Sequence, residues 1–95
     1  MAGPNYAEQI LVDGTRTIVT PQNPAKGFTL RECYEHTHSD IIQIGQARDG
    51  RIIIMDEEGK VAGKPINHAA TELYIHGHLD PIVGDVIVTP KGWFK

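Results

Sequence analysis

Two patterns of apolar residues alternate along the chain, and together they predict a mixed fold. Short runs rich in Ile, Val and Thr recur between turn signals, which is typical of β-strands. Two other segments repeat apolar residues at spacings of three and four, which is the period of an α-helix. The predicted strands cover residues 9–12, 15–20, 40–44, 51–55 and 82–88, the last interrupted by Gly84.

Asp-Gly pairs are expected to close two hairpins. Asp13 and Gly14 lie between the first two apolar runs, and Asp49 and Gly50 lie between the third and fourth. A tight hairpin turn needs positive φ at its central residues, which glycine adopts without steric penalty. Strands joined by such short turns pair in antiparallel fashion.

The first helix is predicted to begin after Thr29. Thr29 and Glu32 match the capping box, in which each side chain accepts a hydrogen bond from the other residue's backbone amide. Leu30, Cys33 and Tyr34 then fall on one side of a helix of about two turns, and we expect that side to be buried.

The second helix is predicted to begin at the Pro-Ile-Asn sequence of residues 65–67. Asn67 is a competent N-cap, and Gly77 is expected to end the helix. The predicted apolar face consists of Ile66, Ala70, Leu73 and Tyr74.

These elements predict a single α+β domain over residues 9–95. Its expected core is a small, mostly antiparallel, twisted sheet of five or six short strands, with two short helices on one face. Residues 1–8 are expected to form a flexible N-terminus, because Gly3, Pro4 and Asn5 favour no regular element.

Composition and charge narrow the functional classes. The chain has 95 residues and a net charge of −3, with nine scattered Lys and Arg against twelve Asp and Glu. Because nucleic-acid-binding domains usually carry a basic patch, we expect no direct contact with nucleic acid. No apolar run approaches the ~18 residues of a membrane span. The lone cysteine, Cys33, cannot form an intrachain disulfide and is predicted to be a core thiol, so we expect a cytoplasmic protein.

The sequence His-x-His-x-Asp occurs twice and raises the question of a metal site. Two imidazoles two residues apart on an extended segment point the same way, so each pair could offer two nitrogens to zinc or another divalent metal. The competing interpretation is that both segments follow helices, where a histidine cation is favoured by the helix dipole. We therefore expect no cofactor, with a metal as the alternative. The four candidate ligands are His36, His38, His76 and His78.

Three further places are candidates for binding. Glu57 and Glu58 could act in acid–base chemistry, but in a turn they are expected to point into solvent. Trp93 could anchor a partner or pack back onto the sheet. The helix start at Asn67 could bind a small anion through free amides, or Asn67 could simply cap the helix.

Three stretches of the chain resemble a known family when taken together. They are Met-Asp-Glu-Glu-Gly-Lys at residues 55–60, Lys-Pro-Ile-Asn-His-Ala-Ala-Thr at 64–71, and residues 80–88, which contain Ile-Val-Gly at 82–84. Their order and spacing resemble the domain-of-unknown-function family numbered three-eight-four-six, small proteins encoded by phages, plasmids and integrative elements. The likeness covers roughly residues 10–89. It departs from the family at Asp56, where Asn is common, and at His68, where Arg is common.

The resemblance implies a mobile-element setting in a bacterial host rather than a mechanism. We expect a small cytoplasmic accessory protein that binds and blocks a host protein without catalysis, with defence factors as one class of target. The alternatives are an oligomeric sponge for a nucleotide-type small molecule and a metal-dependent hydrolase built on the paired histidines. A sponge would draw its guanidinium groups from Arg16, Arg31, Arg48 and Arg51.

The expected partners and contact residues follow from the same argument. A chain this short buries only about two thirds of its unfolded surface, so a homodimer or higher homo-oligomer would help its stability. No membrane contact and no catalytic residue are expected. The candidate binding residues are Asn67, His68, Glu57, Glu58 and Trp93.

Overall fold

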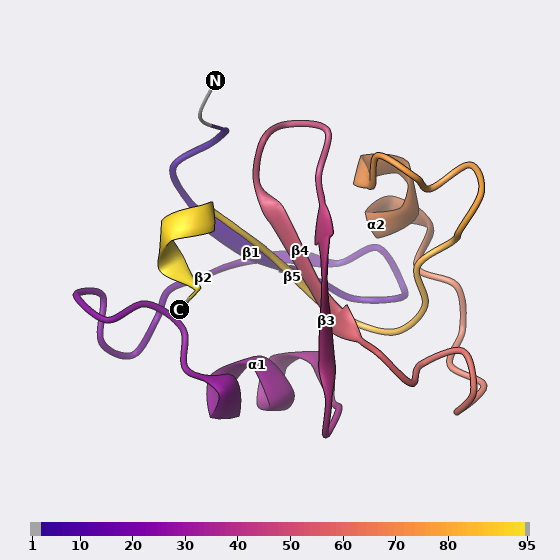
Figure 1. Cartoon of the computed structure of the whole chain (residues 1–95), viewed down its shortest axis with the longest axis horizontal. Coiled ribbons are helices and arrows are strands. Elements are labelled where there is room, and N and C mark those ends of the chain that lie inside the picture. The colour runs from indigo at the N-terminus through magenta and orange to yellow at the C-terminus, as the bar shows by residue number, and fades with distance from the viewer. Residues whose placement is uncertain (1–2, 95) are drawn as a thin grey trace.

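Five strands form one antiparallel sheet in the computed structural model, which describes residues 3–94 (Figure 1). In chain order the strands are β1 (Ala7–Ile10), β2 (Arg16–Val19), β3 (Ile42–Gln46), β4 (Ile52–Asp56) and β5 (Val86–Thr89). Across the sheet the order is β2-β1-β5-β4-β3, so the last strand lies in the middle. The predicted α+β class and antiparallel sheet are confirmed, with five strands.

Both predicted hairpins are present. β1 pairs with β2 and β3 pairs with β4, in both cases antiparallel. Gly14 and Gly50 have φ of +92° and +95°, the left-handed values that the Asp-Gly turns predict. β1 begins two residues before the predicted start, so Ala7 and Glu8 belong to the sheet and are buried rather than part of a loose N-terminus.

Helix α1 (Leu30–Thr37) begins with the predicted capping box. The Glu32 amide donates to Thr29 Oγ1 at 3.1 Å, and the Thr29 amide donates to Glu32 Oε1 at 3.0 Å. Cys33 is buried, as predicted, together with Thr37, but Leu30 in the first turn is half exposed. Burial raises the pKa of the Cys33 thiol to about 11, and the nearby Glu32 carboxylate adds to this effect.

Helix α2 (His68–Leu73) is shorter than its apolar pattern predicts. Its apolar face is buried at Ala70 and Tyr74, but Ile66 is exposed. At Tyr74 the backbone becomes extended and pairs with Ala47, so the chain leaves the helix before reaching Gly77. With eight and six residues, α1 and α2 are both far too short to cross a membrane, and residues 3–94 contain no other α-helix.

The two helices cover opposite faces of the sheet, not the one face that the sequence predicted (Figure 1). Neighbouring residues of a strand point to opposite faces. On β4, Ile54 packs in one cluster with Cys33 of α1, whereas Ile53 packs in the other with Ala70 of α2. The central strands are apolar on both faces, which is typical of a sheet covered on both sides. They read Ile-Ile-Ile-Met in β4 and Val-Ile-Val in β5.

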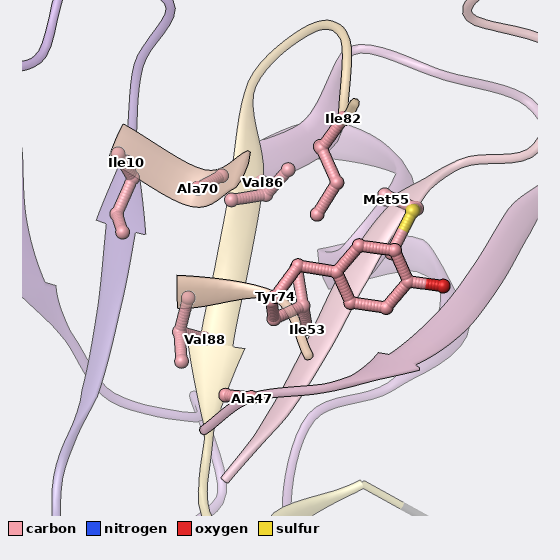
Figure 2. Packing of buried hydrophobic residues seen from close by; sticks show 9 residues of the cluster. All are labelled: Ile10, Ala47, Ile53, Met55, Ala70, Tyr74, Ile82, Val86 and Val88. Carbon is pink, nitrogen blue, oxygen red and sulfur yellow. The ribbon is translucent and has the colours of Figure 1, made fainter. Parts of the chain in front are cut away.

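The cluster on the α2 face is centred on Tyr74, whose ring lies over Ile53 and beside Met55 (Figure 2). Gly45 of β3 makes room for this ring. A Cβ atom at position 45 would lie 2.8 Å from Tyr74 Cε1 and 2.7 Å from Met55 Cε. The buried members of the cluster are Ile10, Ala47, Ile53, Met55, Ala70, Tyr74, Ile82, Val86 and Val88.

The cluster on the α1 face includes the end of the chain. The short 3₁₀ helix η1 (Lys91–Trp93) brings Trp93 and Phe94 against it. The Phe28 amide donates to the Trp93 carbonyl at 2.5 Å, which holds this segment in place. The buried members are Ala7, Phe28, Cys33, Ile52, Ile54 and Ile87.

Candidate functional site

Two loops meet beside the ends of β3 and β4. One is the turn of residues 57–63 after β4, and the other is the connection of residues 76–83 between α2 and β5. The Lys60 ammonium group and the Asp80 carboxylate form an ion pair that joins them. We name the exposed part of these loops the acidic loop surface. It consists of Glu57, Glu58, Lys60, Val61, Leu79 and Asp80.

Asp56 and Lys64 hold the first loop against α1. One Asp56 oxygen accepts the Glu58 amide at 2.9 Å, which shapes the turn, and the other pairs with Lys64 Nζ at 2.7 Å. Lys64 Nζ also donates to the carbonyls of Thr37 and His38 at the end of α1, at 3.3 and 2.7 Å. These two charges therefore support the loop and are not free for a partner.

The acidic loop surface exposes the two most accessible aliphatic side chains among the large apolar residues of the described chain. Val61 is 91% exposed and Leu79 is 78% exposed. Val61 follows Lys60 and Leu79 precedes Asp80, so each lies next to one end of the ion pair. Glu57 and Glu58 are exposed, and neither forms an ion pair with another residue of the described segment 3–94. The surface is therefore acidic with apolar tips.

A small hollow of about 60 Å³ lies between the two loops. Gln43 of β3 and Met55 of β4 line it, together with Glu57, Lys60 and Asp80 of the loops. Pockets that enclose a drug-sized ligand have volumes of roughly 300–1,000 Å³. The geometry therefore favours a shallow contact, such as one with a protein surface.

The structure places Asn67 in the interior, as a helix cap. Asn67 Oδ1 accepts the Ala70 amide at 3.0 Å, which is the predicted N-cap bond. Its Nδ2 donates to the carbonyls of Ile10 and Gly84 at 3.0 and 2.9 Å, and the side chain is fully buried. Both ends of the amide are therefore occupied within the fold, and only the neighbouring His68 reaches solvent.

Trp93 likewise lies away from the acidic loop surface. It is partly buried and packs against the cluster on the α1 face, near Phe28 and Phe94. Of the two interpretations of Trp93, packing onto the sheet is the one that the structure shows. Of the five predicted binding residues, only Glu57 and Glu58 belong to the acidic loop surface.

The first histidine pair lies at the end of α1. The His36 ring packs edge-on against Phe28, with ring centroids 6.3 Å apart. His38 is the C-cap, with φ of +53°, and its Nδ1 lies 2.8 Å from Asp85 Oδ2. The two rings thus have separate partners rather than one shared site.

The second pair follows α2, across the sheet from α1. The His76 ring packs edge-on against Tyr74 with centroids 5.6 Å apart, and His78 is exposed. Within residues 3–94, no three His, Cys, Asp or Glu side chains are grouped so that they could hold a metal ion. The four imidazoles therefore do not gather into the arrangement on which the metal hypothesis depends.

A buried charge network, not foreseen from the sequence, occupies the other end of the sheet. Arg51 is 2% exposed, and its Nη2 lies 2.9 Å from Glu8 Oε2 and 2.8 Å from Asp49 Oδ2. Arg16 Nε lies 2.8 Å from Glu8 Oε1, and the Tyr6 ring stacks on the Arg51 guanidinium at 4.9 Å. Three of the four arginines that a nucleotide sponge could use thus pair with carboxylates: Arg16 and Arg51 in this network, and Arg31 with Glu35 on α1.

Hydrogen bonds from Arg16, and then from Arg51, lower the pKa of Glu8 despite its burial. Burial alone would raise the pKa of Asp49, but the bonds from Arg51 outweigh it and lower that pKa as well. Both carboxylates therefore stay ionised at neutral pH, and the network is a structural element.

A larger hollow of about 580 Å³ lies beside the N-terminal segment. Its size suits a small ligand. Among the described residues 3–94, Lys91 is the only charged residue of its lining, and none of these lining residues is aromatic. The lining residues are Gly3, Pro4, Asn5, Gln46, Gly50, Pro90, Lys91 and Gly92.

Val61 and Leu79 were missed by the sequence analysis. Their only signal is an apolar residue within a segment rich in Gly, Lys, His and Asp, where a turn rather than a core is expected. Comparison with protein-family models, curated proteins and solved structures finds no match to this chain. The resemblance carried by residues 55–88 therefore stays a prediction.

Proposed function

We propose that this protein is a small accessory protein of a phage or mobile element that acts without catalysis, by binding and blocking a host protein, with defence factors as one class of target. The acidic loop surface is the observation that carries this proposal. It combines exposed carboxylates with two aliphatic side chains that almost fully face solvent.

The chemistry of the surface defines the kind of partner. Fully burying an aliphatic side chain contributes about 1.5–3 kcal/mol, so Val61 and Leu79 would be the main contacts in a complex. Glu57 and Glu58 would attract a basic partner and raise its association rate. We therefore expect a partner surface with apolar pockets surrounded by Lys or Arg.

Two further observations support binding over catalysis. General acid–base groups work best in a pocket that excludes water, whereas Glu57 and Glu58 are exposed on a turn. The hollow beside them is far smaller than a substrate pocket. The mobile-element setting rests on the resemblance, and the Asp-Glu-Glu-Gly-Lys stretch that carries part of it covers the last residue of β4 and the first part of the 57–63 loop.

A nucleotide sponge is the second candidate, because the hollow of about 580 Å³ has the volume of a small-molecule site. It ranks lower because Lys91 is the only cation that the described residues 3–94 contribute to its lining. Isothermal titration with a panel of nucleotides tests it. Heat of binding that Lys91→Ala removes would place this function first.

The proposal is tested by affinity capture from a host-cell lysate with tagged protein, followed by binding measurements on any purified partner. We expect one host protein to be captured and to bind Val61→Asp and Leu79→Asp at least about tenfold more weakly, a loss of 1.4 kcal/mol. Leu30→Asp is the matched control, because it adds the same charge at another exposed leucine, on α1.

The variants also define the results that would reject the proposal. If no protein is enriched, or if Leu30→Asp weakens capture as much as the two loop variants, the acidic loop surface is not the binding site. Circular dichroism of each variant shows whether the fold is kept, which we expect because all three side chains are exposed.

A further inference from the structure

The two edges of the sheet differ in how far the rest of the chain covers them. At the β3 edge, the Ile75 amide donates to the Gln46 carbonyl at 3.1 Å and the Arg48 amide donates to the Leu73 carbonyl at 2.8 Å. The residues after α2 therefore cover one end of β3. At the β2 edge, no described segment takes this position.

The hydrogen-bonding pattern shows which β2 residues face outward. The Leu11 amide donates to the Thr15 carbonyl at 2.9 Å, so this pair is hydrogen-bonded. Because hydrogen-bonded pairs alternate with non-bonded pairs in an antiparallel ladder, Thr17 also bonds to β1. Arg16 and Ile18 then direct their N–H and C=O groups away from the sheet.

These outward groups are free within the described chain. No hydrogen bond found between residues 3–94, apart from the β1–β2 ladder, uses the backbone N–H or C=O of Arg16 or Ile18. Edge strands are commonly protected from pairing by charged side chains or proline. The one charge of β2, on Arg16, is already neutralised by Glu8, and Ile18 is 69% exposed.

We propose that β2 forms a homodimer interface, in which two copies pair their β2 strands in antiparallel fashion about a two-fold axis at Ile18. Each Ile18 then lies opposite the partner's Ile18, and Arg16 lies opposite the partner's Thr20. The outward N–H and C=O groups of each strand meet those of the other. The five-stranded sheets of the two copies become one continuous sheet.

This register favours a second copy of the chain as the partner of β2. A second copy offers the same apolar residue at the axis, so the two Ile18 side chains cover each other. No like charges lie opposite each other, because Arg16 faces the hydroxyl of a threonine and keeps Glu8 as its own partner. The interface is thus self-complementary, as a two-fold dimer requires.

The dimer does not depend on the proposed function. β2 is one edge strand of the sheet, whereas Gln43 and Met55 beside the acidic loop surface belong to β3 and β4, toward the opposite edge. Both copies of the acidic loop surface stay accessible in the dimer. A variant that loses dimerisation can therefore still be tested for partner binding, and the reverse.

Sedimentation equilibrium of the full chain over a range of concentrations tests the proposal. We expect a dimer for the wild type, and for Ile18→Lys a rise of at least about tenfold in the dimer dissociation constant. Ile44→Lys is the matched control, since Ile44 is also exposed, at 43%, but lies on the β3 edge. A monomeric wild type, or a dimer broken by Ile44→Lys and not by Ile18→Lys, would overturn the proposal.

Amide hydrogen exchange followed by NMR gives a second, independent test. In the dimer the amides of Arg16 and Ile18 are protected, and this protection disappears on dilution or in Ile18→Lys. The Thr17 amide bonds to β1 within one copy, so it stays protected in every sample and reports that the hairpin is folded. Fast exchange of Ile18 in a dimeric wild type would mean that the copies associate through another surface.

Discussion

The helix start at Asn67 and the turn after β4 both lie in the stretches that carry the family resemblance, yet they use their polar groups in opposite ways. Asn67 is fully buried, and its amide joins β1, α2 and the approach to β5 through three hydrogen bonds. Glu57 and Glu58, ten residues or fewer before it, point their carboxylates into solvent.

This difference separates residues that maintain the fold from residues that are free to bind. A buried polar group stabilises a protein only when its hydrogen bonds are complete, and its loss leaves the former partners unsatisfied. An exposed carboxylate can be changed at little cost to folding. Substitutions of Asn67 should therefore mainly lower stability, whereas substitutions of Glu57 and Glu58 should mainly weaken binding.

The largest effect is expected from Asn67→Ala. The change removes the helix cap and the two hydrogen bonds that the side chain donates to the carbonyls of Ile10 and Gly84. We expect the free energy of unfolding to fall by about 3 kcal/mol or more, measured by urea denaturation. Asn67→Asp keeps the acceptor for Ala70 but not the donors, so it should be nearly as damaging. A loss below about 1 kcal/mol would show that the junction is not essential.

Breaking the buried network at Glu8 should have the next largest effect. Glu8→Gln leaves the buried guanidinium of Arg51 with one carboxylate partner, Asp49, and we expect a loss of about 2–3 kcal/mol at neutral pH. The measurement is again urea denaturation, and Glu35→Gln, at an exposed ion pair on α1, is the control with little expected change.

The same network predicts how stability depends on pH. The pKa of Glu8 in the folded protein lies below its ordinary value of 4.5. Its contribution is therefore complete above that value and is lost as the pH falls through the lower, folded-state pKa. We expect the free energy of unfolding to be nearly constant from neutral pH to about pH 5 and to decrease below it. The free energy of unfolding of Glu8→Gln should decrease less steeply below this pH. A decrease as steep as that of the wild type would mean that Glu8 is not the source of the pH dependence.

The smallest effect on stability is expected at the acidic loop surface. Glu57→Gln combined with Glu58→Gln should change the free energy of unfolding by less than about 0.5 kcal/mol. Association with a basic partner should slow, and the difference from the wild type should shrink as salt screens the charges. Stopped-flow binding at two salt concentrations measures this effect. A large loss of stability would instead assign these carboxylates to the fold.

The parts of the fold that depend on local chemistry could be predicted from the sequence. The Asp-Gly turns and the capping box at Thr29 involve residues within four positions of each other, so their signals are complete in short segments. The placement of the helices could not be predicted in this way. The run of isoleucines in β4 indicates a strand buried on both faces, but it does not indicate which helix covers which face.

The candidate site depended on contacts between distant residues. The ion pair that joins the two loops links Lys60 to Asp80, and no pattern in either segment indicates the pairing. The same is true of Arg51, whose partner Glu8 lies on the other hairpin. The glutamates of the turn were singled out correctly as exposed, because successive carboxylates in a tight turn diverge into solvent.

The central position of β5 sets the order in which the protein can fold. Each hairpin can form from neighbouring residues, but within residues 3–94 the strand pairing that connects β1 with β4 runs through β5, by pairs such as Ile10 with Val86 and Ile54 with Ile87. During synthesis the two hairpins must wait with their apolar faces open until β5 leaves the ribosome. We therefore expect the nascent chain to expose apolar surface to chaperones and proteases until that strand inserts and completes the sheet.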